Sequence, residues 1–526
     1  MNTAAITVAA ANSGTPWLTV AGAIPLVGAI VVALLPVRLA KVTALAFAVA
    51  DLIWVIVMAA QFNTSGPTYQ LTEQYSWIPQ FGVHYALGVD GIALVLIGMT
   101  AVLMPAVFLA SWHDADGTGV QRSPKTYFAL MLALDTMMIG VFAATDVFLF
   151  YVFFEAMLVP MYFMIGSFGV GPRQYAAVKF LLYSLLGGLL MLVAVIALYV
   201  YSSESASTGH HGTFMFYSLV HLALSPTVQK WLFLGFFVAF AIKAPLWPFH
   251  TWLPDAASSA QPGAAVLMLG VMDKVGTFGM IRYCLELFPD GFHYFTPLIL
   301  VLAVISIIYG AIVAIGQTSM KRLIGYTSIS HFGFIVLGIF ALTSQGQSGA
   351  TLYMVNHGFA TGALFLLAGF LIVRRGSDRI ADYGGVQKVA PLLAGLFLVS
   401  GLAGLSLPGL STFVSEFLVL VGTFSRYKVA GSFAVAGIVL AAIYILWMYQ
   451  RTMNGPTAES VAAMPDLRVR ELLAVVPLVA LIIAMGVYPK PVLDVINPAV
   501  KATMSQVGSV DPVPAHPAAA QNGAQP

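Results

Sequence analysis

Long apolar runs separated by short polar connections dominate the chain. A bilayer core of about 30 Å requires about 20 apolar residues for each helical span. By this criterion the pattern predicts fourteen transmembrane helices. They lie near residues 17–37, 42–61, 91–111, 127–143, 147–169, 177–201, 230–252, 262–288, 293–315, 322–342, 350–373, 389–423, 430–450 and 471–488. We therefore predict an all-α, polytopic membrane protein.

Basic residues are distributed unevenly among the connections. Those after odd-numbered spans hold Arg38, Lys41, Arg122, Lys125, Arg173, Lys179, Lys321, Arg322, Arg374, Arg375, Arg379, Lys388, Arg451, Arg468 and Arg470. Those after even-numbered spans, together with the C-terminal tail, hold Lys230, Arg426, Lys428, Lys490 and Lys501. Because cytoplasmic loops are enriched in Lys and Arg, we expect the odd-numbered connections to be cytoplasmic and both termini to be outside.

Composition agrees with a lipid environment and limits the chemistry. Hydrophobic residues make up 60% of the 526 residues, charged residues 8%, and the mean hydropathy is +0.91. A soluble domain is about a quarter charged. The single cysteine, Cys284, excludes an iron–sulfur cluster or a Cys-based zinc site within the chain. No dinucleotide-binding glycine fingerprint or haem motif is present, so we expect no cofactor or metal in this chain.

Ionisable side chains inside the predicted spans are the candidate functional residues, because burying each in lipid costs several kcal/mol. The candidates are Glu155, Lys243, Lys274, His331, His357 and Glu416. Asp135 also lies in a span. Simpler roles compete for some of these groups. Either histidine could hydrogen-bond a neighbouring helix, Asp90 could cap a helix, and Asp273 and Arg282 could form a structural pair or reach an interface.

Glu155 and Lys243 are the candidates least compatible with a purely structural role, because each lies deep in an apolar run. A pair that only held helices together could be replaced by leucines. Burial weakens the proton affinity of a lysine, and a nearby glutamate restores it. A Glu–Lys pair on adjacent helices could therefore load and unload a proton as its separation changes. A second lysine and neutral histidines could carry that proton onward.

Two predicted spans are interrupted by proline. The stretch AIKAPLWPFHTWLPDA places Pro245 and Pro248 just after Lys243, and SLPG places Pro408 ahead of Glu416. Proline leaves carbonyls without helical partners, which is tolerated in a membrane only where the break faces protein or water. The interrupted spans are the seventh and the twelfth, so they cross the membrane in opposite senses. This arrangement predicts two inverted five-helix repeats.

The predicted organisation follows from these repeats. It consists of a three-helix N-terminal region (1–126), a first repeat (127–288), a second repeat (289–451), a last span with its flanks (452–507) and a disordered tail rich in Pro, Ala and Gly (508–526).

At this point the residues resemble a known family. The stretches AIKAPLWPFHTWLPDAASSAQPGAAVLMLGVMDKVGTFGMIR, DVFLFYVFFEAMLVPMYFMIG and KRLIGYTSISHFGFIVLG resemble the antiporter-like membrane subunits of respiratory complex I and of multisubunit cation/proton antiporters. The resemblance covers about residues 85–490. Within the family the chain is most similar to the subunit M group of NADH–quinone oxidoreductase, the counterpart of mitochondrial subunit 4. Glu416 supports this resemblance, because the subunit M group carries a glutamate in the interrupted twelfth span where the other groups usually carry a lysine.

The resemblance implies a role for each candidate. Glu155 would be the gating glutamate, Lys243 its partner, Lys274 the central lysine and Glu416 the exit residue, with His331 and His357 as relay positions. It also implies a proton-translocating subunit of a bacterial plasma membrane complex that couples NADH oxidation and quinone reduction to pumping. Other complex I subunits, including antiporter-like neighbours on both sides, and membrane lipids would be its partners. FMN, iron–sulfur clusters and quinone would belong to those subunits.

Three alternatives stay open. A cation/proton antiporter subunit would share nearly every motif, although Glu416 argues against it. The membrane arm of an energy-converting hydrogenase would also be similar. A structural scaffold in a membrane complex would use the same charges for helix packing, and Glu155→Gln would then impair assembly instead of pumping.

Overall fold

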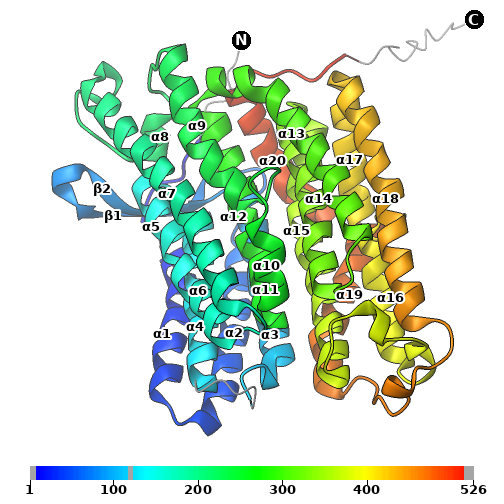
Figure 1. Ribbon diagram of the computed structural model, residues 1–526. Helices are drawn as coiled ribbons and strands as arrows, with labels where there is room; N and C mark the ends of the chain where they lie inside the picture. Colours follow the sequence, from blue (N-terminus) through cyan, green and yellow to red (C-terminus); the bar gives the residue numbers. More distant parts are fainter. Residues whose placement is uncertain (1–6, 13, 117–122, 514–526) are drawn as a thin grey trace, which may run out of the picture.

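A computed structural model describes residues 7–12, 14–116 and 123–513. Upright helices form one bundle, with the N-terminal helices along one edge and the helices of residues 391–453 along the opposite edge (Figure 1). The last two helices pack back against the N-terminal part. Within the described residues, twelve helices are long and apolar enough to cross a bilayer, and each coincides with a predicted span. The other two predicted spans are the interrupted ones. The predicted membrane architecture is confirmed.

The N-terminal region contains a feature that the hydropathy pattern did not predict. Its elements are α1 (Trp17–Leu34), α2 (Val37–Ala59), β1 (Gln70–Ile78), β2 (Val83–Val89) and α3 (Gly91–Ala110). β1 and β2 pair as an antiparallel hairpin that projects from the edge of the bundle (Figure 1). The hairpin lies in the connection between the second and third spans, where no long apolar run draws attention to it.

The first repeat contains the first interrupted helix. Its elements are α4 (Pro124–Ala143), α5 (Val147–Ala156), α6 (Leu158–Phe168), α7 (Arg173–Glu204), α8 (Phe216–Leu219), α9 (Pro226–Lys243), α10 (Trp252–Ser259), α11 (Pro262–Leu267) and α12 (Lys274–Gly279). Two π-helical segments, Met268–Met272 and Met280–Leu285, widen the eighth span on either side of α12. Such π turns often mark functional sites in helices.

The second repeat contains the other interrupted helix, and two further helices follow it. The elements are α13 (Pro289–Ile315), α14 (Met320–Phe340), α15 (Ser344–Arg375), α16 (Pro391–Gly404), α17 (Ser411–Arg426), α18 (Lys428–Met453), α19 (Val469–Val487) and α20 (Lys490–Gln506). In Figure 1, α9 lies above α10 whereas α16 lies below α17, so the two interrupted helices run in opposite senses. This agrees with the predicted inversion.

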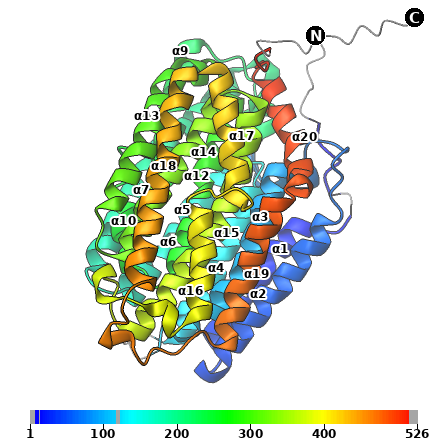
Figure 2. The same ribbon diagram turned by 90° about the vertical axis from the view of Figure 1, so that its right-hand side faces the viewer.

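The C-terminal end departs from the sequence-based prediction. Helix α20 was not predicted, because its polar residues hide it from a hydropathy criterion. Part of the segment predicted to be disordered from residue 508 is held against the bundle: Ser509 Oγ donates to the carbonyl of Leu342 (3.1 Å) and Asp511 Oδ1 accepts from Ser344 N (2.7 Å). The remainder of the predicted tail, 514–526, lies outside the described residues. Figure 2 shows α20 and α19 in line along one side of the bundle.

Candidate functional site

Glu155 and Lys243 lie near each other at the ends of α5 and α9. Lys243 is the last residue of α9, is 1% exposed, and its Nζ has no hydrogen-bond partner among the described residues. It interacts electrostatically with Glu155, although the two groups are too far apart to form an ion pair. The Nζ lies 4.9 Å from the centre of the Phe154 ring. The ammonium is therefore held close to a carboxylate without being tied to it.

A glycine makes room for the glutamate. A Cβ atom at Gly188 of α7 would lie 1.6 Å from Glu155 Oε1, closer than any real atom can approach. Only glycine fits there while the carboxylate keeps this position. The adjacent Gly187 lies against α9 in the same way, because a Cβ at this residue would lie 3.0 Å from Ala239 Cα. The sequence analysis did not identify either glycine.

The interruption between α9 and α10 packs against protein, one of the two surroundings in which such a break is tolerated. Trp252 Nε1 donates to the carbonyl of Ile242 (2.9 Å), and Trp247 N donates to Ser306 Oγ (2.7 Å). A Cβ at Gly276 would lie 2.5 Å from Ala244 N, so α12 comes close to the broken backbone. These contacts satisfy polar backbone groups that proline releases.

Lys274 begins α12 and is completely buried. Its Nζ lies 2.6 Å from His357 Nδ1 on α15 and also donates to the carbonyl of Leu269. Leu269 belongs to the π-helical segment that precedes α12. A charged lysine can only donate, so when Lys274 carries its charge the hydrogen of a neutral His357 lies on Nε2, which has no partner among the described residues. One lysine and one histidine, 83 positions apart, thus share a hydrogen bond.

The buried groups continue from His357 to Glu416. The rings of His331 and His357 have centres 5.2 Å apart. His331 Nε2 donates to the carbonyl of Gly404 at the end of α16 (3.1 Å). Tyr353 of α15 lies between the histidines and Glu416: its ring centre is 5.9 Å from that of His331, and its hydroxyl donates to the carboxylate. Glu416 itself is 4% exposed.

Comparison with known proteins decides the family. The family model described as NADH:quinone oxidoreductase/Mrp antiporter, TM, matches residues 144–443. NADH-quinone oxidoreductase subunit M of Mycobacterium tuberculosis is 56% identical over 538 aligned residues, which cover 95% of this chain and 97% of the relative. The chain belongs to the NADH-quinone oxidoreductase subunit M family.

Solved structures agree with this assignment. A chain of respiratory complex I from Thermus thermophilus superposes with a TM-score of 0.85 at 31% identity, covering 94% of this chain and 100% of that chain. A chain of the Mrp complex from Dietzia superposes with a TM-score of 0.81 at 20% identity, covering 94% and 99%. At that identity the Mrp likeness shows a common fold alone.

Asp273 also belongs to this row of ionisable groups in the subunit M family protein. The sequence analysis had instead suggested a structural or interfacial role for it. It is completely buried, neither carboxyl oxygen has a hydrogen-bond partner among the described residues, and it interacts electrostatically with both Lys243 and Lys274. The suggested pairing with Arg282 is wrong, because Arg282 forms an ion pair with Asp90 (3.0 Å). Asp90 also accepts from Ala93 N (2.8 Å), which confirms its predicted capping role.

Tyr353 was missed for a different reason. A tyrosine in a long apolar helix is usually part of the packing, and the sequence offered no signal that this one contacts Glu416. The pairing depends on how α15 lies against α17. Asn356, one turn farther along α15, also donates to the carbonyl of Ser411 at the start of α17 (2.6 Å). The two contacts fix α15 against the second interrupted helix.

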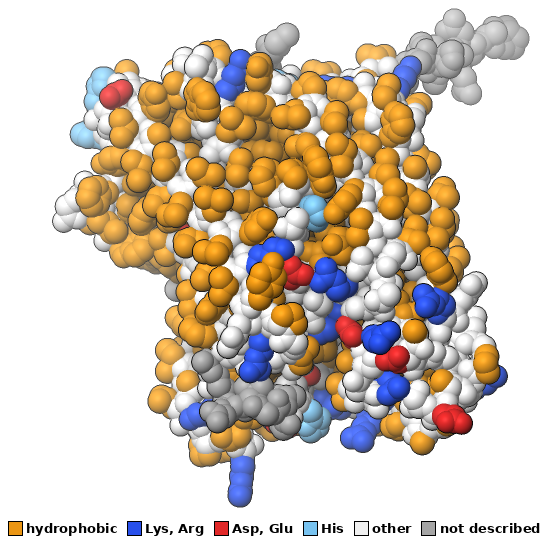
Figure 3. Space-filling model, viewed as in Figure 1, with side chains coloured by type: hydrophobic (Ala, Val, Ile, Leu, Met, Phe, Trp, Pro, Cys, Tyr) orange, Lys and Arg blue, Asp and Glu red, His pale blue; other side chains and the backbone are white. Residues whose placement is uncertain are grey.

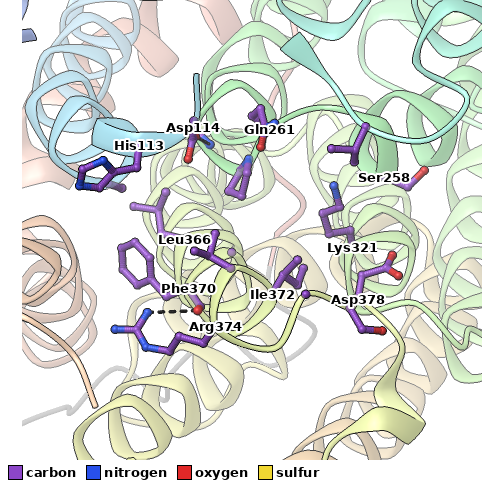
Figure 4. A pocket seen from close by; sticks show the side chains of 18 of the residues that line it. His113, Asp114, Ser258, Gln261, Lys321, Leu366, Phe370, Ile372, Arg374 and Asp378 are labelled. Carbon is purple, nitrogen blue, oxygen red and sulfur yellow. Dashed lines mark hydrogen bonds between the residues drawn. The ribbon is translucent and has the colours of Figure 1, made fainter. Parts of the chain in front are cut away.

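A cavity lined by both apolar and charged side chains lies apart from these groups, at the end of the bundle where basic residues gather (Figures 3 and 4). Its volume is about 1170 Å³. Lys321 Nζ donates to the carbonyl of Ala260 (3.0 Å), and Arg374 pairs with Glu471 (2.5 Å). Burial raises the pKa of Asp114 to about 6. The cavity brings polar surface to the lower ends of α11 and α15.

Proposed function

We propose that this chain is the proton-translocating membrane-arm subunit of NADH–quinone oxidoreductase, in which it couples NADH oxidation and quinone reduction to proton transfer. Membership of the subunit M family supports the assignment to this complex. The observation that supports proton transfer is the row of ionisable groups from the half-buried Glu155 to Glu416, in which Lys243, Asp273, Lys274, His331, His357 and Glu416 are all buried. No purely structural role requires so many buried charges in one row.

The electron chemistry would take place in other subunits. We propose that FMN, iron–sulfur clusters and quinone are bound by partners, and that this chain acts as a non-redox translocase subunit between neighbouring antiporter-like subunits. The exposed apolar surface of the bundle suits lipids and such neighbours (Figure 3).

The first step would be a change in distance between Glu155 and Lys243. Burial penalises the ammonium, and the carboxylate stabilises it only while the two are close. Within the described residues, Lys243 has no competing hydrogen bond to hold its proton. A movement of α5 transmitted from a neighbouring subunit would therefore make Lys243 gain or release a proton.

The second step would pass that proton to Lys274. Asp273 interacts with both lysines, and its carboxyl oxygens have no hydrogen-bond partner in the described part of the chain. A carboxylate in this position stabilises positive charge on either lysine and lowers the cost of moving it from one to the other. We therefore add Asp273 to the proposed relay.

The third step would carry the proton to the outer side. Lys274 donates to His357, water would bridge the unpartnered ring nitrogens of His357 and His331, and Tyr353 leads to Glu416. Glu416 would release the proton outside and be reprotonated in the next cycle.

This direction depends on the orientation of the chain. Figure 3 shows Lys and Arg side chains gathered at the lower end of the bundle, and Figure 1 shows the last helix, α20, at the upper end. By the preference of basic residues for the cytoplasm, we propose that the lower end faces the cytoplasm and that both termini lie outside.

Two substitutions test the proposal in inverted membrane vesicles that contain the whole complex. Glu155→Gln removes the charge that stabilises Lys243, and Lys243→Ala removes the ammonium. We expect each to reduce NADH-driven proton uptake about tenfold, with the complex assembled on native gels. Lys388→Ala, at an exposed position, is the control and should pump normally. Full pumping by either relay variant would contradict the proposal, and loss of assembly by Glu155→Gln would favour a scaffold.

A further inference from the structure

Two aspartates in the N-terminal part of the bundle lie outside the proposed relay. Asp51 belongs to α2 and Asp135 to α4. The buried residues of α2 form one stripe that repeats every three or four positions, and Asp51 occupies a place in it: Ala40, Ala44, Ala48, Asp51, Val55 and Met58. The large residues on the other faces of α2, such as Ile53 and Ile56, are exposed to lipid. Asp51 therefore points into the protein, along a seam of small side chains.

Neither aspartate has a partner in the described structure. Both side chains are 0% exposed, and none of their four carboxyl oxygens has a hydrogen-bond donor. Asp135 interacts electrostatically with Asp51, so the two carboxyl groups are near each other. Two independently buried groups on different helices thus lack the partners that buried carboxylates normally have.

The surrounding helices provide no cation to balance them. The ranges of α1 and α3 contain no ionisable side chain. Basic residues of α2 and α4 lie in the first turns, and the Lys41 ammonium is already bound to Asp116 (2.5 Å) and to the carbonyl of Trp112 (2.6 Å). α5, α6, α12 and β2 also pack on α4. His84 and Tyr85 of β2 are not among the groups that interact with the two aspartates. Neither aspartate interacts with the ionisable groups of α5 and α12, which are Tyr151, Glu155 and Lys274. The ionisable group of α6 is the phenol of Tyr162.

Two buried carboxyl groups in these surroundings cannot both be ionised. An isolated carboxylate in an apolar interior costs many kcal/mol, and a second negative charge beside it raises the cost. A metal cation would need about six oxygen ligands, and the carbonyls of the continuous helices α2 and α4 are already used in helical hydrogen bonds. A proton needs only the carboxyl groups themselves.

We propose that Asp51 and Asp135 form a second proton-binding site in the membrane, which holds at least one proton at neutral pH and is separate from the Glu155–Glu416 relay. The site does not depend on the direction or mechanism of pumping. Its position on α4 places it next to the helices that carry Glu155 and Lys274. The proton keeps this neighbouring part of the bundle free of uncompensated negative charge.

Infrared spectroscopy of the purified complex in lipid nanodiscs tests the site without turnover. Protonated and ionised carboxyl groups absorb in separate regions, and the protonated band shifts in heavy water. We expect Asp51→Asn and Asp135→Asn each to change the protonated-carboxyl region relative to wild type. Asp116→Asn is the control. Partial burial raises the pKa of Asp116, but hydrogen bonds from Lys41 and His113 outweigh it and keep this pKa below its usual value. Asp116 is therefore ionised, and its replacement should remove only a carboxylate band.

Assembly provides the second measurement. Asparagine has the shape of a protonated aspartic acid, so both variants should assemble at wild-type levels. An unchanged protonated-carboxyl region in both variants, or carboxylate bands of this pair that respond to sodium, would overturn the proposal. So would failure of both asparagine variants to assemble while the corresponding Asp→Glu variants assemble.

Discussion

At the interruption between α9 and α10, the carbonyl of Ile242 accepts a hydrogen bond from the indole of Trp252. At the interruption between α16 and α17, the carbonyl of Gly404 accepts one from His331. The first break is closed by a side chain that does not titrate, and the adjacent Lys243 has no hydrogen-bond partner among the residues that the structure describes. The second is closed by a candidate relay residue.

The charged side chains near the two breaks also differ in their hydrogen bonding. Lys243 has only electrostatic and ring contacts, whereas Glu416 accepts a hydrogen bond from Tyr353. A group without a hydrogen bond responds readily when a neighbouring charge moves, and a hydrogen-bonded group is held in place. The comparison suggests that the first break is where proton affinity is switched and the second is where the proton is received. Two related breaks in one fold can thus serve unlike tasks.

The largest effect is expected from a change that separates Glu155 from Lys243 without altering either residue. In Gly188→Ala, the new Cβ would collide with Glu155 Oε1. We expect the carboxylate to move and proton uptake per NADH oxidised to fall about tenfold, as measured in inverted vesicles. Gly98→Ala, where a Cβ meets open space, should pump normally. Normal pumping by Gly188→Ala would show that the position of Glu155 is not decisive.

A smaller effect is expected at the second break. Tyr353→Phe removes the hydroxyl that donates to Glu416, a charge-assisted bond worth about 1.5–3 kcal/mol. We expect proton uptake to fall several-fold, because Glu416 loses its position at the end of the relay. Tyr444→Phe is the comparison variant, since its hydroxyl lies 3.4 Å from His331 Nε2 and contributes a weaker contact. Equal effects of the two changes would argue against a special role for Tyr353.

Closure of the first break should affect stability more than transport. Trp252→Phe keeps the aromatic bulk but leaves the Ile242 carbonyl without its donor, at a cost of about 1–3 kcal/mol. We expect a lower thermal midpoint of the purified complex and an unchanged ratio of protons pumped to NADH oxidised. Trp231→Phe, at a 71% exposed position, should change neither. A fall in pumping ratio at normal stability would mean that Trp252 takes part in transfer.

The smallest effect concerns Asp114, which is remote from both breaks. Burial raises its pKa from 3.8 to about 6, so the folded state binds this proton more tightly than the unfolded chain. The stability contributed by this proton is full below about pH 4 and is lost as the pH rises through about 6. Asp114→Asn should remove that dependence. We expect the thermal midpoint of the variant to change by a few degrees less than that of wild type between acidic and neutral pH, and an identical response would contradict the expectation.

Most of the membrane architecture could be predicted because each span has to be apolar along its whole length. The same constraint made Glu155, Lys243, Lys274 and Glu416 visible, since charges are rare in such runs. The proline interruptions were visible for a similar reason. Features outside the apolar runs were not: the β1–β2 hairpin lies in a polar connection, and α20 is too polar for a hydropathy criterion. The predicted domain boundaries and the roles of the six candidates remain predictions.

Contacts between distant segments were beyond the sequence. Nothing in the apolar run around Tyr353 distinguished it from other buried aromatics, and the sequence analysis did not identify Asp51. Gly188 was one of 48 glycines. Each acquires its meaning from an atom on another helix: the Glu416 carboxylate, the Asp135 carboxyl group and Glu155 Oε1.

The sequence by itself determined that this chain crosses the membrane many times, where its helices break and that several charges lie within its spans, because lipid imposes these patterns residue by residue. The tertiary structure alone decided that Lys274 meets His357, that Asp273 lies between two lysines and that a glycine makes room for Glu155. Those arrangements depend on how each helix is rotated and how closely it packs on its neighbours, and the local amino-acid composition specifies neither.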